Sequence, residues 1–283
     1  MTNNQNCFCV LTTDVATAVE DAMKLGGLVT VVMRHAERPP LELGDMTFGR
    51  DLPLTDKGAR DADRLGARLS ALCPGCDISF FYGESLRCLM TAERMARQIE
   101  GATLALVAAS FLGGESPYLA NVNERLALAN VGNYTDSLNA YFATGRQRGF
   151  NEHHSATAAF ATSLAAMQTT RIGVFVTHDL NVACYAAGIG ACRVFSDSSW
   201  PAFLSGIVAA KLCSRTPRSS SPTPRSSSTT SPSAPGLGNS ASGENGIPLA
   251  TRNGAAVLPC YRTLLPSFFA SAMNLVPLTV PFS

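Results

Sequence analysis

The chain has 283 residues, 46% of them hydrophobic, so it is long enough to bury one large core or two small ones. Lys and Arg number 22 against 21 Asp and Glu, and this balance excludes the broad basic surface of a nucleic-acid-binding protein. The first residues, MTNNQNCFCVLTTD, contain neither the basic nor the long apolar stretch of a secretory signal. We therefore expect a cytoplasmic protein whose nine cysteines, an odd number, are reduced.

Strands and helices alternate along residues 1–213. Continuous apolar runs at 28–33, 78–82 and 172–177 predict strands buried on both faces, and another apolar run covers 203–212. Apolar residues at helical spacing predict helices at 56–72, 86–101, 155–167 and 180–187, with Thr55 and Ser85 as N-caps of the first two. The alternation predicts one α/β domain over 1–213, a three-layer sandwich of a mainly parallel sheet flanked by helices.

The stretch 110–151 is irregular and rich in Asn, Gly and Tyr. We interpret it as a cap over a site, in which substrate specificity would reside.

Residues 214–283 differ in composition from everything before them. The part 214–240 is rich in Ser, Pro and Thr, which predicts disorder. The apolar end of the chain is interrupted by Pro266, Pro277 and Pro281, which argues against a membrane-spanning helix. Because the change is abrupt, a second hypothesis is that this low-complexity tail comes from a shifted reading frame.

Polar residues follow each of the three predicted buried strands. They are Arg34-His35-Ala36-Glu37-Arg38-Pro39, Ser85-Leu86-Arg87 and His178-Asp179. Ligands bind at the carboxyl ends of strands in open α/β sheets, so these three clusters predict one site. The two remaining histidines, His153 and His154, lie in a polar loop, and we interpret both as solvated surface.

Together these side chains are suited to phosphoryl transfer. The forked guanidinium groups of Arg34, Arg38 and Arg87 match phosphate oxygens, and Arg87 lies in the first turn of its helix. A neutral imidazole is a competent nucleophile towards phosphorus, and nearby cations keep it unprotonated. The leaving alkoxide needs a general acid, for which Asp179 and Glu115 are the candidates. The spacing of the residues shows no metal site, and we expect no cofactor.

The pair Cys73 and Cys76 forms a CxxC motif. It could be half of a zinc or redox site, but no second CxxC or nearby histidine completes it, and a turn between helix and strand is the alternative.

Four motifs resemble the histidine phosphatase superfamily, which includes the phosphoglycerate mutases and the histidine acid phosphatases. Arg34-His35-Ala36 is similar to the family's Arg-His-Gly signature, with Ala in place of Gly. LTDKGARDADRLGARL resembles its Leu-Thr-x-x-Gly stretch, GESLRCLMTAERMA its phosphate-binding arginine element, and VTHDLNVA its second-histidine segment. The resemblance spans about residues 28–212 and implies a phosphoglycerate mutase-like fold.

The resemblance also implies roles for individual residues. His35 would be the phosphorylated nucleophile, with Arg34, Arg87 and His178 around the phosphate. RHAERPP and His178-Asp179 resemble the acid-phosphatase and phytase branch, which would add Arg38 to the phosphate site and make Asp179 the proton donor.

The expected activity is hydrolysis of a small phosphomonoester. A phosphomutase and a catalytically degenerate protein that binds phosphorylated ligands are the alternatives. The oligomeric state stays open.

Overall fold

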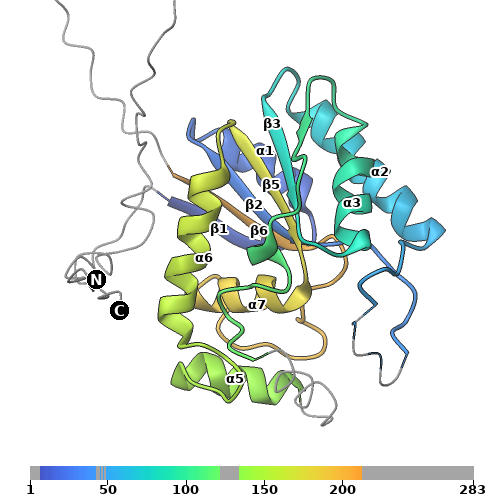
Figure 1. Cartoon of the computed structure of the whole chain (residues 1–283). Helices are drawn as coiled ribbons and strands as arrows, with labels where there is room; N and C mark the ends of the chain where they lie inside the picture. The colour runs from blue at the N-terminus through green and yellow to red at the C-terminus, as the bar shows by residue number, and fades with distance from the viewer. Residues whose placement is uncertain (1–6, 43–44, 46, 48, 122–133, 212–283) are drawn as a thin grey trace, which may run out of the picture.

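The protein is built around one six-stranded sheet in the order β1-β6-β2-β5-β3-β4 (Figure 1). The computed structural model describes residues 7–42, 45, 47, 49–121 and 134–211. The strands are β1 (Cys7–Thr12), β2 (Val29–Arg34), β3 (Ile78–Tyr82), β4 (Thr103–Leu104), β5 (Ile172–Thr177) and β6 (Gly206–Lys211).

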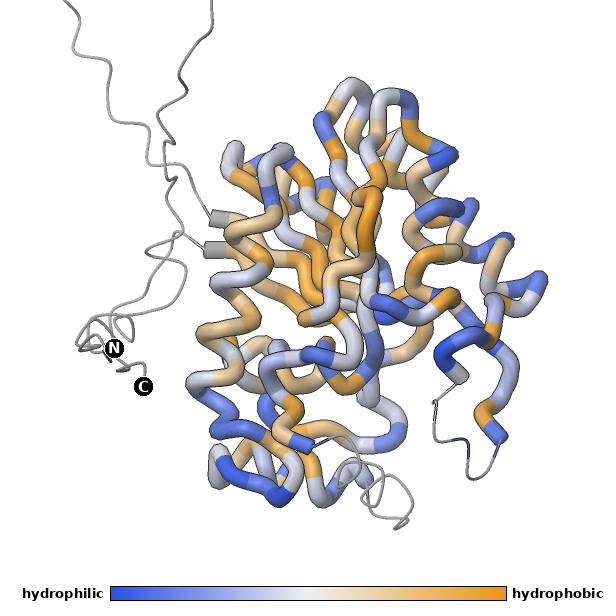
Figure 2. The backbone as a smooth tube through the Cα atoms, viewed as in Figure 1, coloured by the Kyte–Doolittle hydropathy of each residue, from blue (hydrophilic) through white to orange (hydrophobic). Residues whose placement is uncertain are grey.

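Strands β2, β5, β3 and β4 run parallel, whereas β6 is antiparallel to both β2 and β1. Every residue of β3 and β5 is buried, as expected for strands covered on both faces. Figure 2 shows hydrophobic residues concentrated in the strands of the sheet. The predicted mainly parallel sheet is confirmed.

Helices cover both faces of the sheet, which gives the three layers expected from the sequence (Figure 1). One face carries α1 (Val15–Met23), α2 (Asp56–Leu72) and α3 (Leu86–Ala96), and the core beneath them is one hydrophobic cluster. A second cluster lies under α5 (Tyr134–Thr144), α6 (His153–Met167) and α7 (Asp179–Gly188) and includes a short 3-10 helix at Ser110–Leu112. The two clusters hold the sheet from opposite sides.

The start of α2 is held against the loop that follows β2. Thr55 caps the helix as predicted, its hydroxyl accepting a 2.9 Å hydrogen bond from Gly58 N, and Thr55 N donates to Glu37 O at 3.0 Å. A Cβ atom at Gly58 would lie 2.2 Å from the Glu37 carbonyl oxygen. Only glycine permits this close approach, which fixes the loop two residues beyond His35.

Several predictions about the helices and strands needed correction. The helix expected to reach Gly101 ends at Ala96, and Ser85 occupies its N-cap position without a capping hydrogen bond from its side chain. The apolar run 203–212 becomes a strand only from Gly206, because Leu204 has a φ of 59°, outside the extended region. β1, α1, β4 and α5 were not predicted, and α5 lies within the stretch 110–151 that was expected to be irregular.

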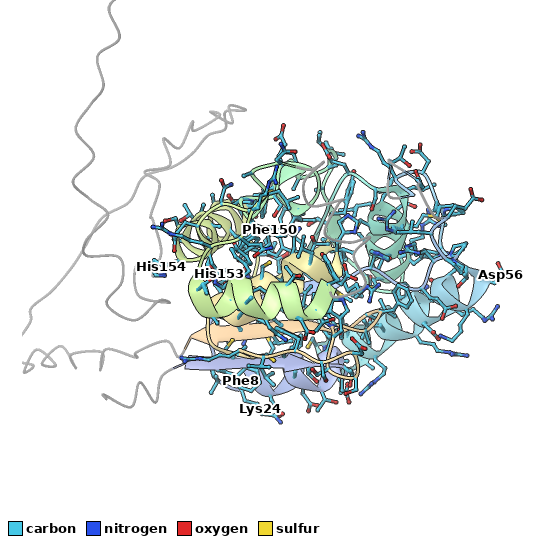
Figure 3. All side chains as sticks on the ribbon, turned by 90° about the horizontal axis from the view of Figure 1, so that it is seen from below. Phe8, Lys24, Asp56, Phe150, His153 and His154 are labelled. Atoms are coloured by element: carbon cyan, nitrogen blue, oxygen red, sulfur yellow. The ribbon has the colours of Figure 1, made fainter. Side chains whose placement is uncertain are left out.

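The interpretation of His153 as surface was wrong. His153 is buried, and its Nε2 lies 2.9 Å from the Cys184 carbonyl oxygen, whereas His154 is exposed. Both belong to the first turn of α6 (Figure 3), where adjacent residues point to different sides of the helix. Tyr141 and Phe142 surround the buried ring, so His153 is a residue of the core.

The predicted cap is described only in part, because residues 122–133 lie outside the described residues, as does the predicted tail at 214–283. The first part of the cap is hydrogen-bonded to the end of β5 and to α7. The Leu112 carbonyl accepts hydrogen bonds from Thr177 Oγ1 at 2.6 Å and from Asn181 Nδ2 at 3.2 Å. Among the residues described, no helix is long and apolar enough to cross a membrane.

Candidate active site

The three polar clusters meet at one edge of the sheet. The parallel pairing of β2 with β5 places Arg34 opposite Thr177, so His35 and His178 follow at adjacent positions. Their imidazole rings lie edge to face with centroids 5.5 Å apart. Arg87 reaches the same point from the first turn of α3, which follows β3. The strand register therefore assembles the cluster.

His35 is 2% exposed, and both ring nitrogens have a partner. Nδ1 lies 2.7 Å from the Ala36 carbonyl oxygen, which can only accept, so Nδ1 carries the proton. Nε2 receives a 3.0 Å hydrogen bond from Arg87 Nε, which can only donate, so Nε2 presents its lone pair. These contacts select the tautomer whose free lone pair points to the arginine.

The pKa of His35 lies well below its ordinary value. Burial is the main cause, followed by the charges of His178, Arg87 and Arg34, and the hydrogen bond to Ala36 opposes the shift. A neutral imidazole throughout the neutral pH range is what a nitrogen nucleophile requires.

The backbone around His35 is fixed from two directions. His35 N donates to Thr177 O at 2.9 Å, and Ala36 N donates to Thr91 Oγ1 at 3.0 Å. The Thr91 hydroxyl in turn donates to the Arg87 carbonyl at 2.7 Å. Thr91 thus couples the loop of the histidine to the helix of the arginine, a role that the sequence motif did not reveal.

Three arginines surround the histidine. Arg87 is buried and donates through Nη1 to Gly49 O at 2.5 Å, and burial lowers its pKa, although an arginine remains charged at neutral pH. Arg34 donates to the Pro201 carbonyl and Arg38 to the Pro39 carbonyl, each at 2.6 Å. The Nε atoms of Arg34 and Arg38 are buried and have no hydrogen-bond partner among the described residues.

Buried donors without a partner are rare in native proteins, and here they belong to two adjacent cations. An anion with several acceptor oxygens would satisfy them. The cluster is therefore complementary to a phosphoryl group.

Asp179 lies at the start of α7, beside the arginines. Its Oδ2 accepts a hydrogen bond from Trp200 Nε1 at 3.1 Å and forms an ion pair with Arg34 Nη2 at 3.2 Å. Burial raises the pKa of Asp179, but Arg34, Trp200, His178 and His35 lower it further, so the pKa lies below its ordinary value. The side chain is 33% exposed and can therefore meet a ligand.

Glu115 is placed differently. It is exposed, and its Oε2 accepts a hydrogen bond from Ser110 Oγ at 2.5 Å. In the described part of the chain it has no hydrogen bond or ion pair with His35, Asp179 or the three arginines. The structure thus brings Asp179, and not Glu115, into contact with the cluster.

One further side of the site, the segment 200–205 that leads into β6, was not predicted from the sequence. Trp200, the single tryptophan, contacts Asp179, the Pro201 carbonyl contacts Arg34, and the Phe203 ring lies against Arg34 and His35. No periodicity or motif marks these residues, and only their return to the sheet edge brings them to the site.

The remaining predicted features add nothing to this site. Cys73 and Cys76 flank a turn in which Cys76 N donates to Cys73 O at 3.1 Å, and burial raises the pKa of Cys73 to about 11. Among the residues that the structure describes, no group of three or more His, Cys, Asp or Glu could hold a metal ion.

Residues 30–108 match the model of the histidine phosphatase superfamily (branch 1). The match contains Arg34, His35, Arg38 and Arg87 and ends before His178 and Asp179. The match covers less than a third of the chain and agrees with the resemblance that the motifs carry. No curated protein sequence matches the chain significantly.

Three solved structures illustrate what the chain is similar to. A putative phosphohistidine phosphatase SixA from Agrobacterium tumefaciens is 15% identical, with 58% of this chain and 78% of that chain covered and a TM-score of 0.36. Phosphoserine phosphatase from Entamoeba histolytica is 16% identical, with 59% and 81% covered and a TM-score of 0.36. Phosphoglycerate mutase from Plasmodium falciparum is 13% identical, with 64% and 85% covered and a TM-score of 0.34.

Proposed function

We propose that the protein hydrolyses small phosphomonoesters through a phosphohistidine formed on His35. The observation that carries this proposal is the state of the His35 ring, buried and neutral, with Nδ1 protonated and the Nε2 lone pair directed at Arg87. A histidine with only a structural role would not need a lone pair that faces a cluster of cations. Here that cluster also contains two N–H donors without a partner among the described residues.

The first half of the reaction makes a P–N bond and breaks a P–O bond. The phosphoryl oxygens take over the N–H donors of Arg87, Arg34 and Arg38, which frees the Nε2 lone pair of His35 to attack phosphorus. His178, whose ring lies beside that of His35, is placed to share the charge on the phosphoryl oxygens. The ester oxygen leaves and takes a proton from a general acid.

Asp179 is the better candidate for this acid. Arg34 and Trp200 keep the pKa of Asp179 below its ordinary value, so the carboxyl group is ionised at neutral pH. A bound phosphate dianion adds negative charge and draws Arg34 towards itself, and both effects raise the pKa of Asp179. The acid therefore gains its proton when substrate is present.

In the second half, water attacks the phosphohistidine and gives a proton to the Asp179 carboxylate left by the first half. The P–N bond breaks, inorganic phosphate leaves, and the free His35 and the acid are regenerated. Transfer to a second hydroxyl group instead of water would make the protein a phosphomutase.

A panel of phosphomonoesters, read by release of inorganic phosphate, tests the proposal. We expect turnover that survives chelators and is inhibited by vanadate, which mimics pentacoordinate phosphorus. Transfer of the phosphoryl group to an added alcohol, without release of inorganic phosphate, would instead support a mutase. Phosphate binding without turnover of any ester would support a degenerate binding protein and refute the proposed hydrolase.

A further inference from the structure

Phe203 touches two residues of the phosphate site at once. Its ring centroid lies 4.2 Å from Arg34 Cζ and 5.7 Å from the centroid of the His35 ring. Phe203 lies outside every motif that carries the family resemblance and outside the matched residues 30–108.

The backbone next to Phe203 adopts an uncommon conformation. Leu204 has a φ of 59° and is the one non-glycine residue with positive φ in the described ranges. This left-handed region disfavours residues with a Cβ atom, so such a residue persists only where its surroundings impose it.

The hydrogen bonds that hold Leu204 in this conformation connect the turn to the phosphate site. Ser205 N and Oγ both donate to the Ala202 carbonyl, at 3.1 and 2.7 Å, which closes the turn around Phe203. The Ser205 carbonyl then accepts a 2.9 Å hydrogen bond from Arg34 N. The strained turn is thus hydrogen-bonded to the backbone of Arg34, the last residue of β2. It holds the Phe203 ring against the side chain of the same arginine.

The contact suits the chemistry of both partners. An aromatic face holds a guanidinium group by cation–π attraction and stacking while leaving its N–H groups in the guanidinium plane free for phosphate oxygens. The same ring lies against that of His35. A leucine in its place would be smaller, would cover less of His35 and would not attract the cation.

We propose that Phe203 is a positioning residue that fixes the Arg34 guanidinium for phosphate binding and shields the His35 ring. This inference rests on the proposed function, because it assigns the two contacted groups to phosphate binding and nucleophilic attack.

The test compares Phe203→Leu, which removes the aromatic face, with Phe203→Tyr, which retains it. Binding of inorganic phosphate is measured by titration calorimetry and hydrolysis of p-nitrophenyl phosphate across pH. Phe203→Leu should bind phosphate about 3- to 30-fold more weakly, the range expected for a lost cation–π contact. Phe203→Tyr should stay within about twofold of the wild type.

The pH profile separates positioning from simple packing. Besides Phe203, the titratable and charged groups around His35 are His178, the cations Arg87 and Arg34, and the Asp179 carboxylate. Since burial is the main reason that the pKa of His35 is low, admitting water in Phe203→Leu should raise it. The acid limb of kcat/KM should therefore move to higher pH, and it should not move in Phe203→Tyr.

Thermal melts of both variants confirm that they fold. Unchanged phosphate affinity and an unmoved acid limb in a folded Phe203→Leu protein would overturn the inference, as would equal losses in the Leu and Tyr variants. Calorimetry needs no turnover: a protein that binds phosphate in the predicted order of variants but hydrolyses no ester would refute the proposed hydrolase and leave the role of Phe203 standing.

Discussion

The two sides of the candidate site are built in different ways. The nucleophile side, His35 with Arg87, is buried, and the hydrogen bonds of the histidine ring are with Ala36, the next residue, and with Arg87 on α3. The acid side, Asp179 with Trp200, is partly exposed, and its contacts join the start of α7 to a segment twenty-one residues further along the chain.

In the proposed mechanism, this difference separates the groups that are ready before substrate binds from those that change during turnover. On the nucleophile side every group already has the protonation state that attack requires. On the acid side the Asp179 carboxyl group is ionised and paired with Arg34. It must lose this ion pair and gain a proton before it can act as a general acid. Substitutions on the first side should therefore remove chemistry altogether, and substitutions on the second should change its dependence on leaving group and pH.

The largest effect should come from His35→Ala. Without the nitrogen nucleophile no phosphoenzyme forms, and kcat/KM should fall by at least about 10⁴-fold for every substrate. Acid quenching after incubation with ³²P-labelled substrate should trap acid-labile label on the wild type and none on the variant.

A melting transition like that of the wild type serves as the control for folding, because the ring fills a buried space. Label that persists in His35→Ala would show that another residue accepts the phosphoryl group.

Asp179→Asn should have the next largest effect, and the leaving group should decide its size. An alkyl alkoxide cannot depart without a proton, so its release should slow by about 10²–10⁴-fold, the usual worth of a positioned acid. p-Nitrophenolate is stable without a proton, and its release should slow much less. Rates of the wild type and of Asp179→Asn on an alkyl phosphate and on p-nitrophenyl phosphate give the two losses, whose ratio measures the dependence on the leaving group.

Glu115→Gln is the matched variant, since it removes the charge of the other candidate acid. It should be mild and should not distinguish the two kinds of ester, because Glu115 is exposed and bonded to Ser110. If the dependence on leaving group appears in Glu115→Gln instead, the acid has been assigned to the wrong residue.

The same contrast explains how much the sequence predicted. Three buried apolar runs, each followed by a polar cluster, were sufficient to predict the sheet edge at which His35, Arg87 and His178 meet, because parallel strands end at one edge. Thr55 and the helix at 56–72 were predicted to the residue, since a cap and an apolar stripe are local signals.

The missed parts depend on contacts between distant segments. Phe203 and Trp200 follow no period, and their role arises from the turn at Leu204 that returns the chain to Arg34. His153 looked like half of a polar pair, and only the packing of Tyr141 and Phe142 around it makes it a core residue. Asp179, by contrast, was already the favoured acid, because it directly follows His178 and the His-Asp pair resembles the acid-phosphatase branch.

Arg87→Lys should produce a loss of about 10²–10³-fold in kcat/KM, the usual cost of removing one preorganised donor from a transferring group. Lysine keeps the positive charge but not the planar fork, so it cannot face His35 Nε2 and reach Gly49 O together. Phosphate release by Arg94→Lys is the matched control, because Arg94 lies on the same helix and pairs with Asp63. Equal losses in both variants would point to damage to α3 and not to the site.

The smallest effect, and the finest test of the acid side, should come from Trp200→Phe. This change removes the N–H that Asp179 Oδ2 accepts and keeps an aromatic ring near Tyr134 and Phe195. A hydrogen bond to the carboxylate lowers the pKa of the acid, so its loss raises the pKa of Asp179. A general acid acts only while protonated, and the basic limb of kcat on an alkyl phosphate should therefore move to higher pH, by up to about one unit. At the optimum, kcat should fall only a few-fold, since Arg34 still orients the carboxyl group.

The acid limb reports on His35, which Trp200 does not contact in the described structure, and should stay in place. A basic limb that moves in Trp200→Phe and vanishes in Asp179→Asn would assign that limb to Asp179. A limb that is unmoved by both substitutions would remove Asp179 from the role of acid.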